Sequence, residues 1–187
     1  MEELLKRMIE ESIAAKKQIP IDKVIIAINK ITESLRRNGK VMVCGNGGSA
    51  ADSQHMAGEF VNRFKIERNP FPCVSLTTDT STITAIGNDY SFDEVFSKQV
   101  FAIGKQGDVL VGISTSGNSK NVIRATEVAR RKGIYTICFL GKDGGKLKDF
   151  CDLPIIVPAN DTPRIQECHE LIMHMIAEIV EKELVKG

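Results

Sequence analysis

A run of hydroxyl, amide and glycine residues, Ser114-Thr-Ser-Gly-Asn-Ser119, has the composition of a phosphate-binding turn. It follows the apolar residues Val109 to Ile113, which are typical of a buried strand, and it precedes a helical pattern. A turn at this place lies over the helix N-terminus, where free N–H groups and the helix dipole favour an anion. The run lacks the lysine of a Walker loop. Ser119 alone would explain an ordinary helix N-cap, but three hydroxyl residues in succession exceed that need, so we favour a phosphate site.

His55 and Glu59 are four residues apart in a segment that reads as a helix, and Arg63 follows after four more. Four-residue steps advance about 40° around a helix axis, so the three side chains are expected on one face. An imidazole and a carboxylate one turn apart can ligate one metal ion or act as acid and base. The alternative is an exposed row of ion pairs. We favour the functional interpretation because the chain has only three histidines and this helix begins at a glycine turn.

The segment from Thr162 onward reads as a long helix that is buried or lies in a subunit contact, since apolar residues occur on nearly all its sides. Thr162 and Pro163 provide the start signal. Gln166 and His174 are eight residues apart, about 80° around the axis, so one ligand could contact both. His169 lies on the other side of Gln166, where a hydrogen-bonded core histidine is a sufficient interpretation.

A second strand–turn–helix unit begins with Lys40 to Cys44 and continues into Gly45-Asn-Gly-Gly-Ser49. It matches the relaxed dinucleotide fingerprint G-x-G-x-x-A, but the first acidic residue after the next strand is Asp79, too far along to bind a ribose. The glycines more plausibly let the backbone approach a smaller ligand.

Five short segments read as strands, at residues 40–44, 74–76, 109–113, 134–140 and 153–157, and helical patterns separate them. This alternation predicts an α/β fold, a doubly wound five-stranded parallel sheet with helices on both faces. Ligands of such sheets bind at the carboxyl ends of the strands, where the strand order reverses. The turns at residues 45–49 and 114–119 both lie at carboxyl ends. Helical spacing also runs from Phe92 to Ile103.

Residues 1–38 read as two helices separated at Pro20, ahead of the first strand. They are therefore not crossover connections. They could form a partner or oligomer surface, or pack on their own sheet, and the sequence does not distinguish the two.

Composition predicts one soluble domain over residues 1–187, with residues 1–38 as a helical extension. The net charge of +1 gives no argument for nucleic acid or an anionic membrane as partner. The five cysteines are scattered singly, as expected for reduced thiols in a cytoplasmic protein. We find no signal peptide and no apolar run long enough to span a membrane.

Together these motifs resemble the sugar isomerase (SIS) domain family, and within it the phosphoheptose isomerase branch. The residues that carry the resemblance are Cys44-Gly-Asn-Gly-Gly-Ser-Ala-Ala-Asp52, His55 with Glu59, Gly87-Asn-Asp89, Ile113 to Ser119, and Arg164-Ile-Gln-Glu167 with His174. Pro163 departs from the branch pattern, in which some members have an acidic residue at this position. The resemblance covers essentially the whole chain.

The resemblance implies an aldose–ketose isomerase that converts sedoheptulose 7-phosphate to D-glycero-D-manno-heptose 7-phosphate for surface glycans such as lipopolysaccharide. It implies a homotetramer, and a Zn²⁺ ion in those members that carry one. The expected phosphate ligands are Ser114, Thr115, Ser116 and Ser119. The groups expected to hold sugar hydroxyls are Asn46, Gly47, Gly48, Asn88 and Asp89. The expected zinc ligands are His55, Glu59, Gln166 and His174, with Glu59 and His174 also as the acid–base pair; Glu59 and Gln166 are expected to contact substrate as well.

Two non-enzymatic alternatives follow from the same family. One is a regulator that binds the replication initiator DnaA on a similar tetramer, and the other is a module that only senses a phosphosugar. Isomerisation through an enediol needs a base, an acid near the carbonyl oxygen and stabilisation of the developing charge. Because Glu59 and His174 are both present, the sequence favours the enzyme.

Overall fold

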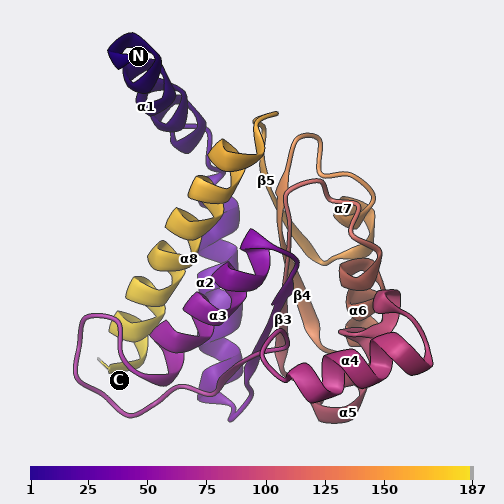
Figure 1. Cartoon of the computed structure of the whole chain (residues 1–187). Helices are drawn as coiled ribbons and strands as arrows, with labels where there is room; N and C mark the ends of the chain where they lie inside the picture. Colours follow the sequence, from indigo (N-terminus) through magenta and orange to yellow (C-terminus); the bar gives the residue numbers. More distant parts are fainter. Residues whose placement is uncertain (186–187) are drawn as a thin grey trace.

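The computed structural model describes residues 1–185 and contains a five-stranded, all-parallel sheet between two layers of helices (Figure 1). This confirms the predicted doubly wound α/β fold. The strands, which lie in the order β2-β1-β3-β4-β5, are β1 (Val41–Gly45), β2 (Cys73–Ser75), β3 (Val109–Ser114), β4 (Tyr135–Gly141) and β5 (Leu153–Val157).

The strand order reverses between β1 and β3, which lie side by side although β2 comes between them in the sequence. Their register pairs Cys44 with Gly112 and Gly45 with Ile113, so the two strands end at nearly the same level. Every residue of both strands is buried. The two polar turns predicted to bind ligand therefore leave neighbouring strands at the switch point, where doubly wound sheets bind their ligands.

Three long helices cover one face of the sheet, and shorter helices cover the other (Figure 1). The first group is α2 (Ile21–Arg36), α3 (Gly48–Val61) and α8 (Thr162–Val185), and the second is α4 (Thr80–Asp89), α5 (Ser97–Ile103), α6 (Lys120–Arg131) and α7 (Leu147–Phe150). Strand side chains alternate between the two cores: Val41 and Val43 join the first, whereas Met42 and Cys44 join the second.

The two N-terminal helices behave differently. Helix α2 buries Val24, Ala27, Ile28 and Ile31 in the core under the sheet, so it packs on its own domain. Helix α1 (Glu2–Lys16) projects away from the body (Figure 1), and its only buried residue is Ala15. Its large apolar side chains are between 41% and 60% exposed, and they are Leu4, Leu5, Met8, Ile9 and Ile13.

Two sequence-based expectations are wrong in detail. The helical spacing from Phe92 to Ile103 does not form one helix, because the chain makes a 3-10 turn at Phe92–Glu94 before α5 begins at Ser97. Helix α3 ends at Val61, so Arg63 does not continue the face of His55 and Glu59 and instead pairs with Glu67 at 3.4 Å.

The cysteines, Asp79 and the helix lengths can also be compared with the expectations from sequence. Three cysteines are buried, two are half-buried, and all five are free thiols. Asp79 caps α4 by accepting a hydrogen bond from the Thr82 N–H. Its role is therefore local and structural, and it does not act as the ribose-binding acid of a dinucleotide site. Within residues 1–185, we find no helix with the length and apolar character needed to cross a bilayer.

Candidate active site

The turn after β3 holds its hydroxyl groups close together. Ser114 Oγ is 2.9 Å from Ser119 Oγ and 3.5 Å from Ser116 Oγ. Ser119 is the N-cap residue of α6, yet its hydroxyl contacts Ser114 instead of capping the helix. This geometry argues against a simple N-cap, and clustered hydroxyls beside a helix N-terminus are suited to an anion.

The backbone of this turn is held by close packing at Gly117. Gly117 has a φ of +64°, and a Cβ there would lie 2.0 Å from the carbonyl oxygen of Gly144. The Leu147 N–H donates to the Gly117 carbonyl at 2.9 Å, and the Lys146 N–H donates to Asn118 Oδ1 at 3.2 Å. The segment after β4 therefore fixes the turn in place before any ligand binds.

The turn after β1 is tied to the same region. Gly47 is the N-cap of α3 with φ +56° and ψ −123°, a conformation that favours glycine. Asn46 and Asn121 exchange two amide hydrogen bonds, at 2.9 and 2.8 Å. The Asn46 side chain, expected to hold a sugar hydroxyl, thus has a protein partner that joins the two turns; the sequence contained no signal for Asn121.

The three acid–base and metal candidates His55, Glu59 and His174 come together where α3 packs on α8. His55 Nε2 lies 3.0 Å from Glu59 Oε1 and 3.4 Å from His174 Nε2. The imidazole rings meet edge to face with centroids 5.0 Å apart. Side chains separated by 119 residues in sequence therefore converge on one point from two helices.

The spacing of these atoms suits a metal ion. Zinc bonds of 2.0–2.1 Å in a tetrahedral arrangement place neighbouring ligand atoms about 3.3 Å apart. The distances of 3.0 and 3.4 Å around His55 Nε2 are close to that value. His55, Glu170 and His174 also each offer a ligand atom within 4.8 Å of the others. The residues present therefore fit a divalent metal.

Two carboxylates at this site were not expected. Glu170 Oε1 is 3.8 Å from His55 Nδ1, on the ring edge opposite to Glu59. Asp52 lies one turn before His55, and its Oδ2 is buried without a hydrogen-bond partner among the described residues. Burial and the neighbouring Glu170 raise the pKa of Asp52 to about 6, against the lowering effect of His55. The four-residue steps from Gln166 through Glu170 to His174 were the signal available in the sequence.

The Gln166 amide lies against Gly48, the first residue of α3. A Cβ on Gly48 would be only 1.7 Å from Gln166 Nε2, so the amide group occupies the space that the missing side chain leaves. Gln166 thus reaches the turn after β1, and it precedes His174 on α8 by about two helical turns.

Asn88 and Asp89 end α4 and are exposed. Among the described residues, the Asn88 side chain hydrogen-bonds only to Asp89, at 2.9 Å. Within residues 1–185, no hydrogen bond joins this pair to either of the two turns. His169, by contrast, is a core histidine: it is 1% exposed, and its Nε2 lies 3.1 Å from the Leu140 carbonyl oxygen.

Comparisons with known proteins show the family of this chain. Residues 4–141 match the model of the SIS domain family. The chain is 50% identical to a phosphoheptose isomerase from Clostridium acetobutylicum, over 98% of this chain and 96% of that protein. It is 57% identical to a phosphoheptose isomerase from Citrifermentans bemidjiense, over 86% of this chain and 84% of that protein.

Solved structures give the same result. The structure of a phosphoheptose isomerase from Neisseria gonorrhoeae superimposes with a TM-score of 0.91 at 44% identity, covering 97% of this chain and 98% of that one. A phosphoheptose isomerase from Francisella tularensis gives a TM-score of 0.90 at 36% identity over 97% and 96% of the two chains. With its two turns at the switch point and its sequence aligned over nearly its full length, the chain belongs to the phosphoheptose isomerase family of SIS domain proteins.

Proposed function

We propose that this protein isomerises D-sedoheptulose 7-phosphate to D-glycero-D-manno-heptose 7-phosphate. The observation that carries the proposal is that Glu59 Oε1 and His174 Nε2 each lie within 3.4 Å of His55 Nε2, in a protein whose strand β3 ends in a turn of clustered hydroxyls at the switch point. A phosphate held at residues 114–119 would anchor the far end of an extended sugar, and its reacting carbons would then lie toward the α3–α8 contact.

The reaction moves one proton between two carbons. We infer that the Glu59 carboxylate removes the proton from C1 of the ketose while a proton is supplied to the C2 carbonyl oxygen, giving an enediol. Return of a proton to C2 and loss of the C1 hydroxyl proton then give the aldose. His174 is placed to serve the oxygen atoms, because an imidazole can donate and accept near neutral pH. The site thus pairs one base with one acid.

We propose that His55, Glu59, Gln166 and His174 hold a Zn²⁺ ion. Such an ion would polarise the carbonyl and stabilise the enediolate charge. A carboxylate has two oxygens, so Glu59 can offer one to the metal and use the other for the proton. Glu170 faces Nδ1 of His55, the position from which a carboxylate orients a metal-bound imidazole.

We propose that the protein is a cytoplasmic homotetramer in which residues 1–38 help to build the interface. The half-exposed apolar side chains of α1 support this, since α1 contributes little to its own core. A charged residue at Ile9, which is 60% exposed, should lower the assembly state in size-exclusion chromatography without unfolding the domain. The product would enter surface-glycan synthesis.

The test is to mix the protein with sedoheptulose 7-phosphate, with and without added Zn²⁺, and to follow the aldoheptose phosphate. We expect product from the wild type, and a loss of turnover in Glu59→Gln and His174→Ala with the fold retained. Glu67→Gln is the matched control, because Glu67 is an exposed glutamate whose ion-pair partner is Arg63.

A full rate in Glu59→Gln would refute the assignment of the base. Binding of the phosphosugar without any turnover would favour a sensor or a DnaA-binding regulator. The presence of both Glu59 and His174 in contact with His55 disfavours these alternatives, since a binding module has no need of an acid–base pair.

A further inference from the structure

A buried ion pair joins α8, which carries the proposed acid, to the connection that follows α3, the helix of the proposed base. Arg68 Nε lies 3.0 Å from Glu181 Oε1, and the two side chains are only 4% and 1% exposed. Taking two charges out of water is unfavourable, and an apolar pair of similar size is often as stable. Further contacts of the two side chains show which other groups the pair holds in place.

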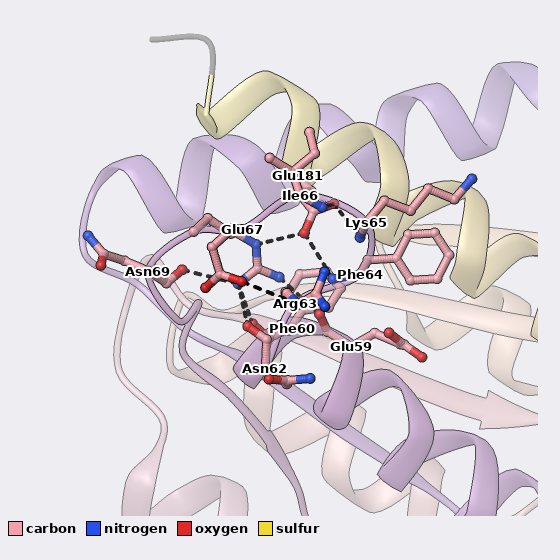
Figure 2. Close-up of polar contacts among 11 residues, drawn as sticks. Glu59, Phe60, Asn62, Arg63, Phe64, Lys65, Ile66, Glu67, Asn69 and Glu181 are labelled. Carbon is pink, nitrogen blue, oxygen red and sulfur yellow. Dashed lines mark hydrogen bonds and ion pairs between the residues drawn. The ribbon is translucent and has the colours of Figure 1, made fainter.

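The Glu181 side chain binds the backbone of the connection between α3 and β2, residues 62–72. Its carboxylate accepts hydrogen bonds from the N–H groups of Phe64, Lys65 and Ile66 at 2.8–2.9 Å (Figure 2). Burial by itself raises the pKa of Glu181, but these three N–H donors and Arg68 outweigh it, so the pKa lies below its usual value. The group is thus a charged anchor on α8 for three successive residues.

Arg68 binds the C-terminal end of α3. Its guanidinium donates to the carbonyl oxygens of Glu59 and Phe60, both at 2.9 Å, and to those of Asn62 and Asn69 at 3.1 Å. The last carbonyls of a helix have no intrahelical partner and form the negative end of its dipole. Arg68 therefore caps α3 at the residue that carries the proposed base.

Phe64 extends this network to the proposed acid. Its N–H is held by Glu181, and its ring lies against the His174 ring, with centroids 5.5 Å apart and planes inclined by 31°. Glu181 and His174 are seven residues apart on α8, within about 20° around the axis, so both face the same connection. One side of the His174 ring thus contacts Phe64 while the other end meets His55.

We propose that the Arg68–Glu181 pair, acting through Phe64, is a positioning device for the isomerase reaction. Arg68 fixes the backbone of Glu59, and the Phe64 ring limits rotation of His174, so that the two reacting groups keep their relative placement. The inference rests on the proposed function of Glu59 and His174. None of these three positioning residues belongs to the proposed phosphate turn, which lies between β3 and α6.

The experiment compares Phe64→Leu and Glu181→Gln with Glu67→Gln, which makes the same carboxylate-to-amide change at an exposed site in the same connection. In Phe64→Leu, we expect kcat to fall roughly 10- to 100-fold, because a displacement of about 1 Å can cost that much. KM should stay within about threefold, and the pH profile of kcat should shift. Glu181→Gln should show the same pattern with a lower Tm, and Glu67→Gln should match the wild type.

A purely structural role would lower Tm or the amount of folded protein while leaving kcat per folded molecule unchanged, and that result would overturn the proposal. A rise in KM as large as the fall in kcat would also overturn the proposal. The chain has three histidines, so the ring signals of ¹³C-labelled histidine can be assigned by substitution. We expect the His174 signal to move and broaden in Phe64→Leu; an unchanged signal would refute the inference even if the wild type showed no isomerase activity.

Discussion

Replacing Gly48 with alanine should abolish most activity without destabilising the protein. The Cβ introduced at this position would lie 1.7 Å from Gln166 Nε2 and 2.6 Å from its Cδ. An ordinary contact begins near 3.4 Å, so the amide has to retreat by about 1.7 Å. The end of a glutamine side chain is flexible, and this movement therefore disturbs the fold little. It disturbs catalysis strongly if Gln166 binds the metal or the substrate.

The magnitude follows from the displacement. A misplacement of about 1 Å in a catalytic group can cost roughly 100-fold in rate, which is about 2.7 kcal/mol of transition-state stabilisation. Gly48 is the first residue of α3, and alanine is favoured over glycine in a helix by up to about 1 kcal/mol. We therefore expect kcat/KM to fall by about two orders of magnitude while Tm stays the same or rises.

Steady-state kinetics and thermal unfolding measure the two effects separately, and Gly58→Ala is the matched control. Gly58 lies in the same helix and is exposed, and a Cβ there would meet nothing within 4 Å. It should gain stability and keep full activity. In addition, Gly48→Ala should cause no further loss in a Gln166→Ala background. Full activity in Gly48→Ala, or a second full loss in the double variant, would refute the role assigned to Gln166.

Three further predictions concern other parts of the site. Ser119→Ala should raise KM about tenfold with kcat retained, because one hydrogen bond to the phosphate is lost in both ground and transition states; an unchanged KM would contradict the phosphate assignment. Glu170→Gln should weaken Zn²⁺ binding roughly 10- to 100-fold in a chelator competition, since Glu170 faces His55 Nδ1, and equal affinity would exclude this orienting role. Burial lowers the pKa of His169 to about 4, against the raising effect of its hydrogen bond to the Leu140 carbonyl. In the unfolded chain the same imidazole has a pKa near 6.5, so between these two pH values the unfolded state binds a proton at His169 and the folded state does not. Stability should therefore be lost as the pH falls from about 6.5 to 4, by about 3 kcal/mol, and His169→Gln should reduce that loss in urea unfolding; the same pH dependence in both proteins would contradict it.

Much of the architecture was predictable because it depends on local sequence patterns. Short apolar runs predicted the five strands, and the polar turns after β1 and β3 predicted where a ligand binds. The four-residue step from His55 to Glu59 places both side chains on one helical face, whatever α3 packs against. The same local reasoning failed at Arg63, because where a helix ends depended on Arg68, whose guanidinium takes up the carbonyls of the last turn of α3.

Other features depended on which elements meet, and no periodicity encodes that. Hydrophobic spacing states which side of a helix is buried, but not against which neighbour. The contact of His55 with His174, the Gln166 amide beside Gly48, and the Arg68–Glu181 pair all join residues more than 100 positions apart. The two N-terminal helices likewise have similar apolar stripes, and only packing assigned α2 to the core and left α1 exposed. The sequence by itself determined the chemical groups and the order of the elements, whereas the tertiary structure decided which groups share one site.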